Sequence, residues 1–218
     1  MPNSRTLVMK FGGTSVGSAQ AMSAAAMIVK NTLAEWPRVV VVTSAISNVT
    51  NLLLDSALHA AAGDISQLPD AEKSLRASHV SITNELISVS IKRNKIIAEI
   101  EELISIFSDL CRAITLIGEA SPRTLDAVAS LGERMSVRLL AAAIEENGVN
   151  AIALDASELI VTNAHFQNAH PDLDATTRQT RAKVLPLLDE GIVPVVTGFI
   201  GATPAGVVTT LGRGGSDY

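Results

Sequence analysis

The stretch that most constrains the fold is residues 38–44, "RVVVVTS", where four valines follow one another between polar ends. A strand with one face in water alternates apolar and polar residues, so an unbroken run of β-branched residues predicts a strand covered on both faces. Such strands are typical of parallel sheets that have helices packed on each side. We therefore expect an α/β fold built around this strand.

The segment before this strand predicts a strand, a glycine loop and a helix in succession. Residues 6–11, "TLVMKF", form an apolar run that ends at Gly12 and Gly13. Ser18 is a suitable N-cap for an alanine-rich helix over residues 18–35. Similar reasoning predicts helices at 49–62, 122–146 and 172–188 and strands at 150–155, 192–199 and 207–210.

The middle of the chain, about residues 70–117, has a different pattern. Its apolar residues recur at steps of three and four, which predicts two long amphipathic helices. We expect them to form an antiparallel hairpin that turns near Arg93 and Asn94. Since strand patterns resume afterwards, the hairpin is interpreted as an insertion and not as a separate domain.

Composition excludes several classes of partner. Of 218 residues, 47% are hydrophobic but only 3% are aromatic, which suits helices layered on buried strands. A net charge of −5 without a basic block argues against nucleic acid or an anionic membrane as the main partner. No apolar run approaches the roughly 20 residues of a membrane span. The single cysteine, Cys111, excludes an intrachain disulfide, and we expect a reducing, cytoplasmic location.

Polar residues that follow the predicted strands are the candidates for a binding site. In an open parallel sheet, ligands bind beyond the carboxyl ends of the strands. One lysine, one arginine, several hydroxyls and glycine N–H groups follow these strands and would suit a phosphate and a carboxylate in one cleft. Neither a Walker A ending nor a complete GxGxxG turn is present. The candidates are Lys10, Gly12, Gly13, Ser44, Ser47, Thr50, Arg213, Ser216 and Asp217.

Each candidate also has a purely structural interpretation. Lys10 could extend from an edge strand into solvent, and Ser44 and Thr50 could cap the helix that follows them. Glu133 could be a solvated residue at the edge of an apolar helix face. Residues 212–218, "GRGGSDY", could form a surface tail.

Four motifs in order resemble the aspartokinase family: "KFGGTSV", "TSAISNVTNLLL", "SLGERMS" and "VTGFIG" followed by "TTLGRGGSDY". The resemblance spans the whole chain. It implies the amino acid kinase fold, a three-layer α/β/α sandwich with a mostly parallel sheet. It also implies ATP-dependent phosphorylation of the β-carboxylate of L-aspartate, the first step toward lysine, threonine and methionine.

The resemblance also implies a role for each candidate. Lys10 and Asp217 would be catalytic, while Arg213 would hold the α-carboxylate of aspartate and Glu133 its α-ammonium. Hydrogen bonds to the substrate would come from Ser44, Thr50 and Ser216. Mg²⁺ would arrive with ATP, without a metal site on the protein, and the longer parent would be a homo-oligomer. The phosphates of ATP would contact Lys10, Gly12, Gly13, Thr14, Ser15, Gly214 and Gly215.

Aspartokinases continue beyond the "GGSDY" motif. We therefore expect residues 1–218 to be the N-terminal, amino-acid-binding lobe, without the ATP-binding lobe and the ACT regulatory domains, and to have little or no kinase activity alone. Two alternatives stay open: another amino acid kinase, acting on glutamate or acetylglutamate, and a non-catalytic amino-acid-binding module. A dinucleotide-binding oxidoreductase is disfavoured because the first strand is not followed by the glycine turn it would need.

Overall fold

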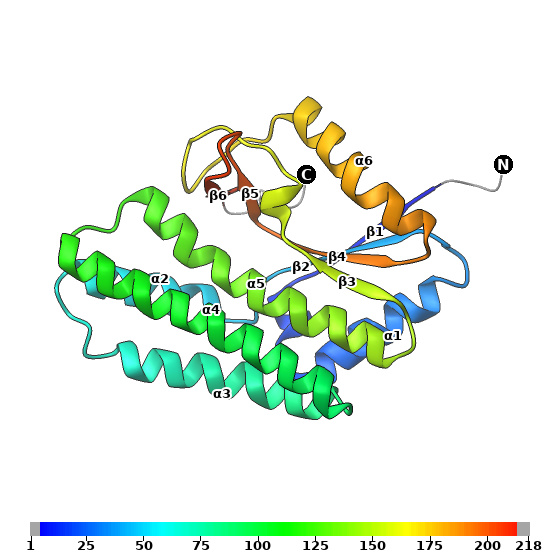
Figure 1. Ribbon diagram of the computed structural model, residues 1–218, viewed down its shortest axis with the longest axis horizontal. Helices are drawn as coiled ribbons and strands as arrows, with labels where there is room; N and C mark the ends of the chain where they lie inside the picture. Colours follow the sequence, from blue (N-terminus) through cyan, green and yellow to red (C-terminus); the bar gives the residue numbers. More distant parts are fainter. Residues whose placement is uncertain (1–4, 213–218) are drawn as a thin grey trace.

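The computed structural model of the chain describes residues 5–212, which form a four-stranded parallel sheet with helices on both faces (Figure 1). The strands lie in the order β1 (Leu7–Phe11), β2 (Val39–Thr43), β4 (Val193–Thr197) and β3 (Ala151–Leu154). The valine run forms β2, inside the sheet between β1 and β4. All neighbouring pairs are parallel, so the four carboxyl ends lie at one edge of the sheet. The predicted α/β fold is confirmed.

The two faces of the sheet are covered by different helices. Helix α6 (Leu173–Asp189) packs against β4 on one face, while α1 (Ala19–Thr32) and α5 (Pro122–Glu146) lie on the other (Figure 1). Strand β4 is buried along its whole length, with Val195 in the large core cluster on the α1 and α5 side and Val196 in a smaller cluster with residues of α6. A fully apolar strand is therefore needed here because each face contributes to a core.

A small hairpin follows the sheet. Strands β5 (Ile200–Ala202) and β6 (Val208–Thr210) pair antiparallel, and Gly206 occupies a left-handed position in the turn, with φ of 77°. The strand predicted over 192–199 is too long, because Phe199 adopts φ of 63° and turns the chain out of the parallel sheet.

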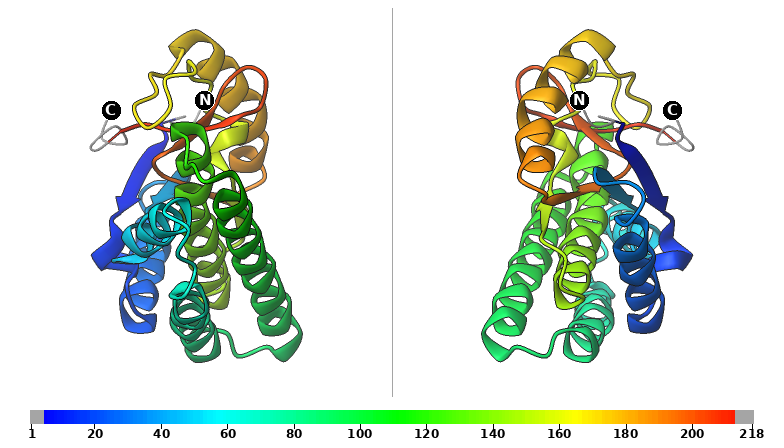
Figure 2. Two further views of the ribbon diagram at one scale, coloured as in Figure 1. Left: turned by 90° about the vertical axis from the view of Figure 1, so that its left-hand side faces the viewer. Right: turned by 90° about the vertical axis from the view of Figure 1, so that its right-hand side faces the viewer.

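Helices α2 (Val49–Ala61), α3 (Leu68–Leu86) and α4 (Ser90–Ile117) form a second helical layer against α5 (Figure 2). The expected hairpin of α3 and α4 is present, but its turn lies at residues 87–89 and not near Arg93 and Asn94. Ile87 is extended and only 1% exposed, and the N–H and hydroxyl of Ser88 donate to Glu146 at the end of α5. The packing of this turn on α5 ends α3 before its apolar pattern stops.

Side-chain caps explain why several helix starts were predictable. The hydroxyl of Ser18 accepts a hydrogen bond from the N–H of Ala21 at the start of α1. At the starts of α5 and α6, the hydroxyl of Ser121 accepts from the N–H of Thr124 and the carboxylate of Asp172 from the N–H of Ala175. Two short 3₁₀ helices, η1 (Gly13–Val16) and η2 (Ala156–Glu158), follow β1 and β3. Across residues 5–212, no helix is long and apolar enough to cross a membrane.

Candidate active site

The carboxyl ends of three neighbouring strands are tied together by backbone hydrogen bonds. The N–H of Ser44 donates to the carbonyl of Phe11 over 3.1 Å, and the N–H of Gly198 donates to the carbonyl of Thr43 over 2.7 Å. The loops after β1, β2 and β4 therefore begin from one rigid edge. This is the edge at which ligands of open α/β sheets bind.

Glu133 reaches this edge from α5 and is buried there. Its side chain is 3% exposed, and Oε1 accepts a hydrogen bond of 3.4 Å from the N–H of Ala45, the second residue after β2. Oε2 is buried without a hydrogen-bond partner among the described residues. Burial raises the pKa of Glu133 to about 7, while the hydrogen bonds from backbone N–H groups lower it in part. The interpretation of Glu133 as a solvated helix residue is wrong.

Two glycines allow this close approach between α5, η1 and the loop after β2. A Cβ atom on Gly132 would lie 2.9 Å from the Cβ of Ala45, and one on Gly13 would lie 2.8 Å from the carbonyl oxygen of Ala45. Real Cβ atoms do not approach other atoms so closely, so either position needs glycine unless the backbone shifts. The two glycines therefore let the segment that bonds Glu133 sit between η1 and α5.

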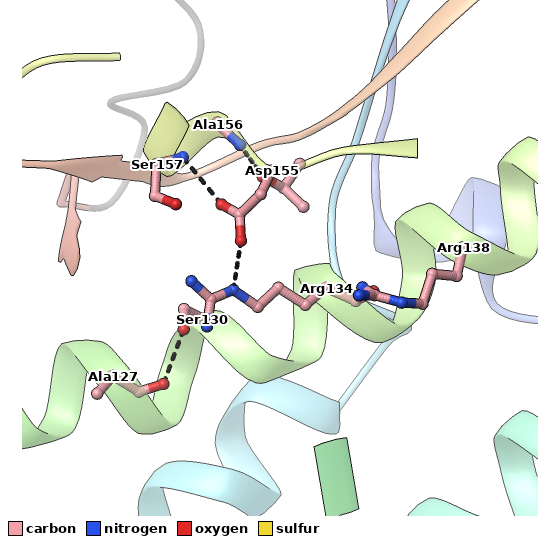
Figure 3. A network of polar contacts seen from close by, with 8 residues as sticks. Ala127, Ser130, Arg134, Arg138, Asp155, Ala156 and Ser157 are labelled. Atoms are coloured by element: carbon pink, nitrogen blue, oxygen red, sulfur yellow. Dashed lines mark hydrogen bonds and ion pairs between the residues drawn. The ribbon is translucent and has the colours of Figure 1, made fainter. Parts of the chain in front are cut away.

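The arginine next to Glu133 is engaged elsewhere (Figure 3). Arg134 donates to Asp155, the residue directly after β3, over 2.6 Å. Asp155 also accepts from the N–H of Ser157 over 2.9 Å. Ser130, one turn before Glu133, donates to the carbonyl of Ala127. Arg134 therefore fixes α5 to the end of β3 and does not neutralise Glu133.

Lys10 lies near the end of β1, in register with Val42 of β2. The side chain of Lys10 is exposed and β1 is an edge strand of the sheet, which agrees with the interpretation of Lys10 as a residue that extends from an edge strand into solvent. Thr14 and Ser15 are exposed in η1, the short helix that begins where β1 ends. The phosphate-binding candidates of the first strand are thus accessible and adjacent in the chain.

Of the three hydroxyl candidates after β2, Ser44 and Thr50 are half-buried and Ser47 is exposed, and none of them caps α2. The N-cap of α2 is Asn48, in a left-handed conformation with φ of 68° and without a side-chain capping bond. Ser44 and Thr50 lie on either side of this turn. The remaining candidates lie outside the described residues: Arg213, Gly214, Gly215, Ser216 and Asp217.

Sequence reasoning missed Asp126, which is 1% exposed on α5 and accepts hydrogen bonds from Thr210 and Gln167. Its only sequence signal is its position seven residues before Glu133, on the same face of the helix. Sequence reasoning also missed the left-handed conformations of Asn48 and Phe199, for which the sequence offers no glycine. Within residues 5–212, no group of three or more His, Cys, Asp or Glu residues could hold a metal ion.

The chain belongs to the amino acid kinase family, whose sequence profile matches residues 5–218. Among known proteins it is similar to the lysine-sensitive aspartokinase 3 of Escherichia coli K12, with 37% identity over 99% of this chain and 45% of that protein. It is also 36% identical to the chloroplastic aspartokinase 1 of Arabidopsis thaliana, over 97% of this chain and 36% of that protein. The chain thus spans less than half the length of these relatives.

Solved structures agree with this relationship. The crystal structure of E. coli aspartokinase III in complex with aspartate and ADP superposes with a TM-score of 0.86 at 35% identity, covering 98% of this chain and 45% of that one. The aspartate kinase of Clostridium acetobutylicum, at 21% identity and a TM-score of 0.66 over 94% of this chain and 41% of that one, shows the same fold. The predicted fold and family resemblance are confirmed.

Proposed function

We propose that this chain is the aspartate-binding part of an aspartokinase, which transfers the γ-phosphoryl group of ATP to the β-carboxylate of L-aspartate. The observation that carries the proposal is Glu133, a buried carboxylate at the ligand-binding edge with one oxygen unpartnered among the described residues. Its support from relatives is the similarity to E. coli aspartokinase III, which has been solved with aspartate and ADP.

Glu133 suits the α-ammonium group of an amino acid. An ammonium placed against Oε2 would supply a cation to a carboxylate that has no ion pair within residues 5–212, and it would favour the ionised form. Arg213 would grip the α-carboxylate in a bidentate manner, with Ser44, Thr50 and Ser216 as further hydrogen-bond donors. A free ammonium is absent from acetylglutamate, so Glu133 favours aspartate or glutamate over that acceptor.

Residues after β1 and the glycines at 214–215 suit the phosphates of ATP. Lys10, Gly12, Gly13, Thr14 and Ser15 follow one another at the end of β1, and a Cβ atom on Gly12 would meet nothing within 4 Å, which leaves room for a phosphate. MgATP would supply the phosphoryl group and the metal ion. The accessible ammonium of Lys10 would neutralise charge on the phosphoryl oxygens as it is transferred.

The reaction needs no general base. The β-carboxylate of aspartate has an ordinary pKa near 4, so it is already an ionised nucleophile at neutral pH. The work of the protein is then to orient the carboxylate toward the phosphorus and to balance charge, with Asp217 orienting the cationic groups. Within this proposal residues 1–218 bind aspartate, and the adenine-binding part lies outside them.

The test is to incubate the complete gene product with L-aspartate, ATP and Mg²⁺ and to trap the acyl phosphate with hydroxylamine. Aspartyl hydroxamate is expected, with glutamate and acetylglutamate as poor acceptors, and residues 1–218 alone are expected to produce little. A complete protein that produces no hydroxamate from aspartate would remove the kinase assignment. Aspartate binding without hydroxamate would instead support the amino-acid-binding module.

A further inference from the structure

Asp126 is a buried carboxylate that joins three separate segments. Its Oδ2 accepts from the N–H of Thr210 over 3.0 Å, and its Oδ1 accepts from the Thr210 hydroxyl over 2.6 Å. The N–H of Gln167 donates to both oxygens, over 3.1 and 3.0 Å. One side chain thus ties α5 to β6 and to the loop of residues 163–170.

The loop and β6 are also tied to each other. The N–H of Ala169 donates to the carbonyl of Thr210 over 2.9 Å, so the residue held by Asp126 is bonded to the loop through its backbone as well. Gln167 holds a left-handed conformation, with φ of 67°, which a non-glycine residue keeps only where its surroundings fix it. A turn closed by the N–H of Asn168 on the carbonyl of His165, over 3.1 Å, and the N–H bonds to Asp126 both restrain it.

Asp126 and Glu133 stand on the same face of one rigid helix. They are seven residues apart, which is two helical turns and about 10 Å along the axis. Because the helix between them is rigid, the separation of the two carboxylates changes little. Whatever Asp126 holds is therefore held at a set distance from Glu133.

The segment that Asp126 holds leads directly to Arg213. Thr210 lies three residues before it, and the next residue, Leu211, donates its N–H to the carbonyl of Phe199 over 3.0 Å. In the proposed function, Glu133 and Arg213 bind the ammonium and the carboxylate that share the α-carbon of aspartate. Their separation must then be set to within a fraction of an ångström.

We propose that Asp126 is a positioning residue for aspartate binding: by fixing Thr210 and Gln167 to α5, it sets the start of the Arg213 segment relative to Glu133. This inference rests on the proposed function. Asp126 does not itself touch the substrate. Replacing Asp126 therefore weakens aspartate binding indirectly, through the positions of Glu133 and Arg213.

The test compares Asp126→Asn and Thr210→Val in the complete gene product. Asparagine keeps the size of the side chain but replaces one acceptor oxygen with a donor, and valine removes only the hydroxyl bond to Asp126. The KM for aspartate is expected to rise about tenfold in Asp126→Asn and less in Thr210→Val, with the KM for ATP within about twofold. Amide hydrogen exchange at residues 167 and 210 should become faster in Asp126→Asn.

Thr209→Val is the matched control. The hydroxyl of Thr209 is equally buried, one residue away, and pairs with the hydroxyl of Thr162 over 2.7 Å instead of with Asp126. It should lower the melting temperature as much as Thr210→Val and leave the KM for aspartate unchanged. Thr210→Val keeps the test available if Asp126→Asn does not fold.

The outcomes separate the two proposals. If the wild-type protein is active and both variants keep its KM for aspartate, the role of Asp126 is overturned and the proposed function stands. The same conclusion follows if Thr209→Val changes this KM as much as Thr210→Val does. Wild-type protein that forms no aspartyl hydroxamate overturns the proposed function, and with it this role.

Discussion

The helical layer of α2, α3 and α4 and the carboxyl edge of the sheet bond their buried polar side chains in different ways. In the helical layer the bonds are local: Thr83 donates to His79 and Thr115 to Cys111, each to the carbonyl one turn earlier in the same helix. At the sheet edge the bonds join distant segments, as between Glu133 and Ala45 or between Asp126 and Thr210. Local bonds stabilise a helix, whereas long-range bonds fix the relative positions of separate loops.

The two regions also differ in the charge they bury. His79, in α3, is fully buried, and its Nε2 has no hydrogen-bond partner within residues 5–212; burial lowers its pKa, which favours the neutral ring. Burial likewise raises the pKa of the Cys111 thiol to about 11, with a contribution from Glu72. Glu133, in contrast, can lose its proton near neutral pH, and it lies at the sheet edge. Substitutions in the helical layer should therefore change stability, and substitutions at the edge should change substrate binding and turnover.

The largest effect is expected from Phe107→Ala in α4. Phe107 is fully buried, so truncation should lower the free energy of unfolding by about 3–5 kcal/mol through lost contacts and a cavity. Thermal and denaturant unfolding would measure this, with the half-exposed neighbour Ile106→Ala as a control of much smaller cost. The KM for aspartate of the folded fraction should not change, and a large change in KM would break the separation between the two regions.

The next largest effect is expected from Lys10→Ala, which should lower the turnover number, kcat. Loss of one cationic group at the transferring phosphoryl is expected to reduce kcat by about 10²–10³-fold. The melting temperature should change little because the side chain is exposed. Val8→Ala, an exposed position on the same strand, is the control in the hydroxamate assay. An unchanged kcat in Lys10→Ala would remove it from the catalytic residues.

Glu133→Gln should raise the KM for aspartate about tenfold and remove its pH dependence. In the free wild-type protein the pKa of Glu133 is raised to about 7 from 4.5, so the unfolded state ionises first as the pH rises. Its contribution to stability is therefore fully present below pH 4.5 and decreases up to about pH 7. Because aspartate favours the ionised form, its KM should fall as the pH rises through 7.

The measurements for Glu133 are unfolding and aspartate kinetics between pH 5 and 8, with the exposed Glu119→Gln as control. Calorimetry in buffers of different ionisation enthalpy should show proton release when aspartate binds to the wild type at about pH 7. If Glu133→Gln and the wild type show the same pH profile, Glu133 is not the group that binds the ammonium.

The smallest effect is expected from Thr83→Val in α3. The substitution removes one hydroxyl bond of 2.7 Å within a single helix and leaves the carbonyl of His79 its helical partner, so the loss of stability should stay below about 1.5 kcal/mol. Unfolding by urea would measure it. A change in the KM for aspartate would show that the helical layer is coupled to the sheet edge.

Prediction from sequence succeeded where local chemistry decides the outcome. Helix α5 has the bounds predicted from the sequence, Pro122–Glu146, with a proline at its first position and an Asn-Gly pair directly after it. It failed at the turn between α3 and α4, because the apolar period continues through residues 87–89 while contacts with Glu146 end the helix. The resemblance named Glu133, but its burial depends on the approach of Ala45 through two glycines far apart in the chain.

The sequence by itself determined the parallel α/β fold, the starts of most helices and the family, because apolar period, capping residues and motif order can all be read along the chain. Only the tertiary structure decided which polar groups are buried away from solvent. The unpartnered oxygen of Glu133 and the three-way bonding of Asp126 arise only when α5 packs against the strand ends. Burial and bond partners depend on neighbours that are distant in sequence, and these neighbours set the pKa and the geometry of the site.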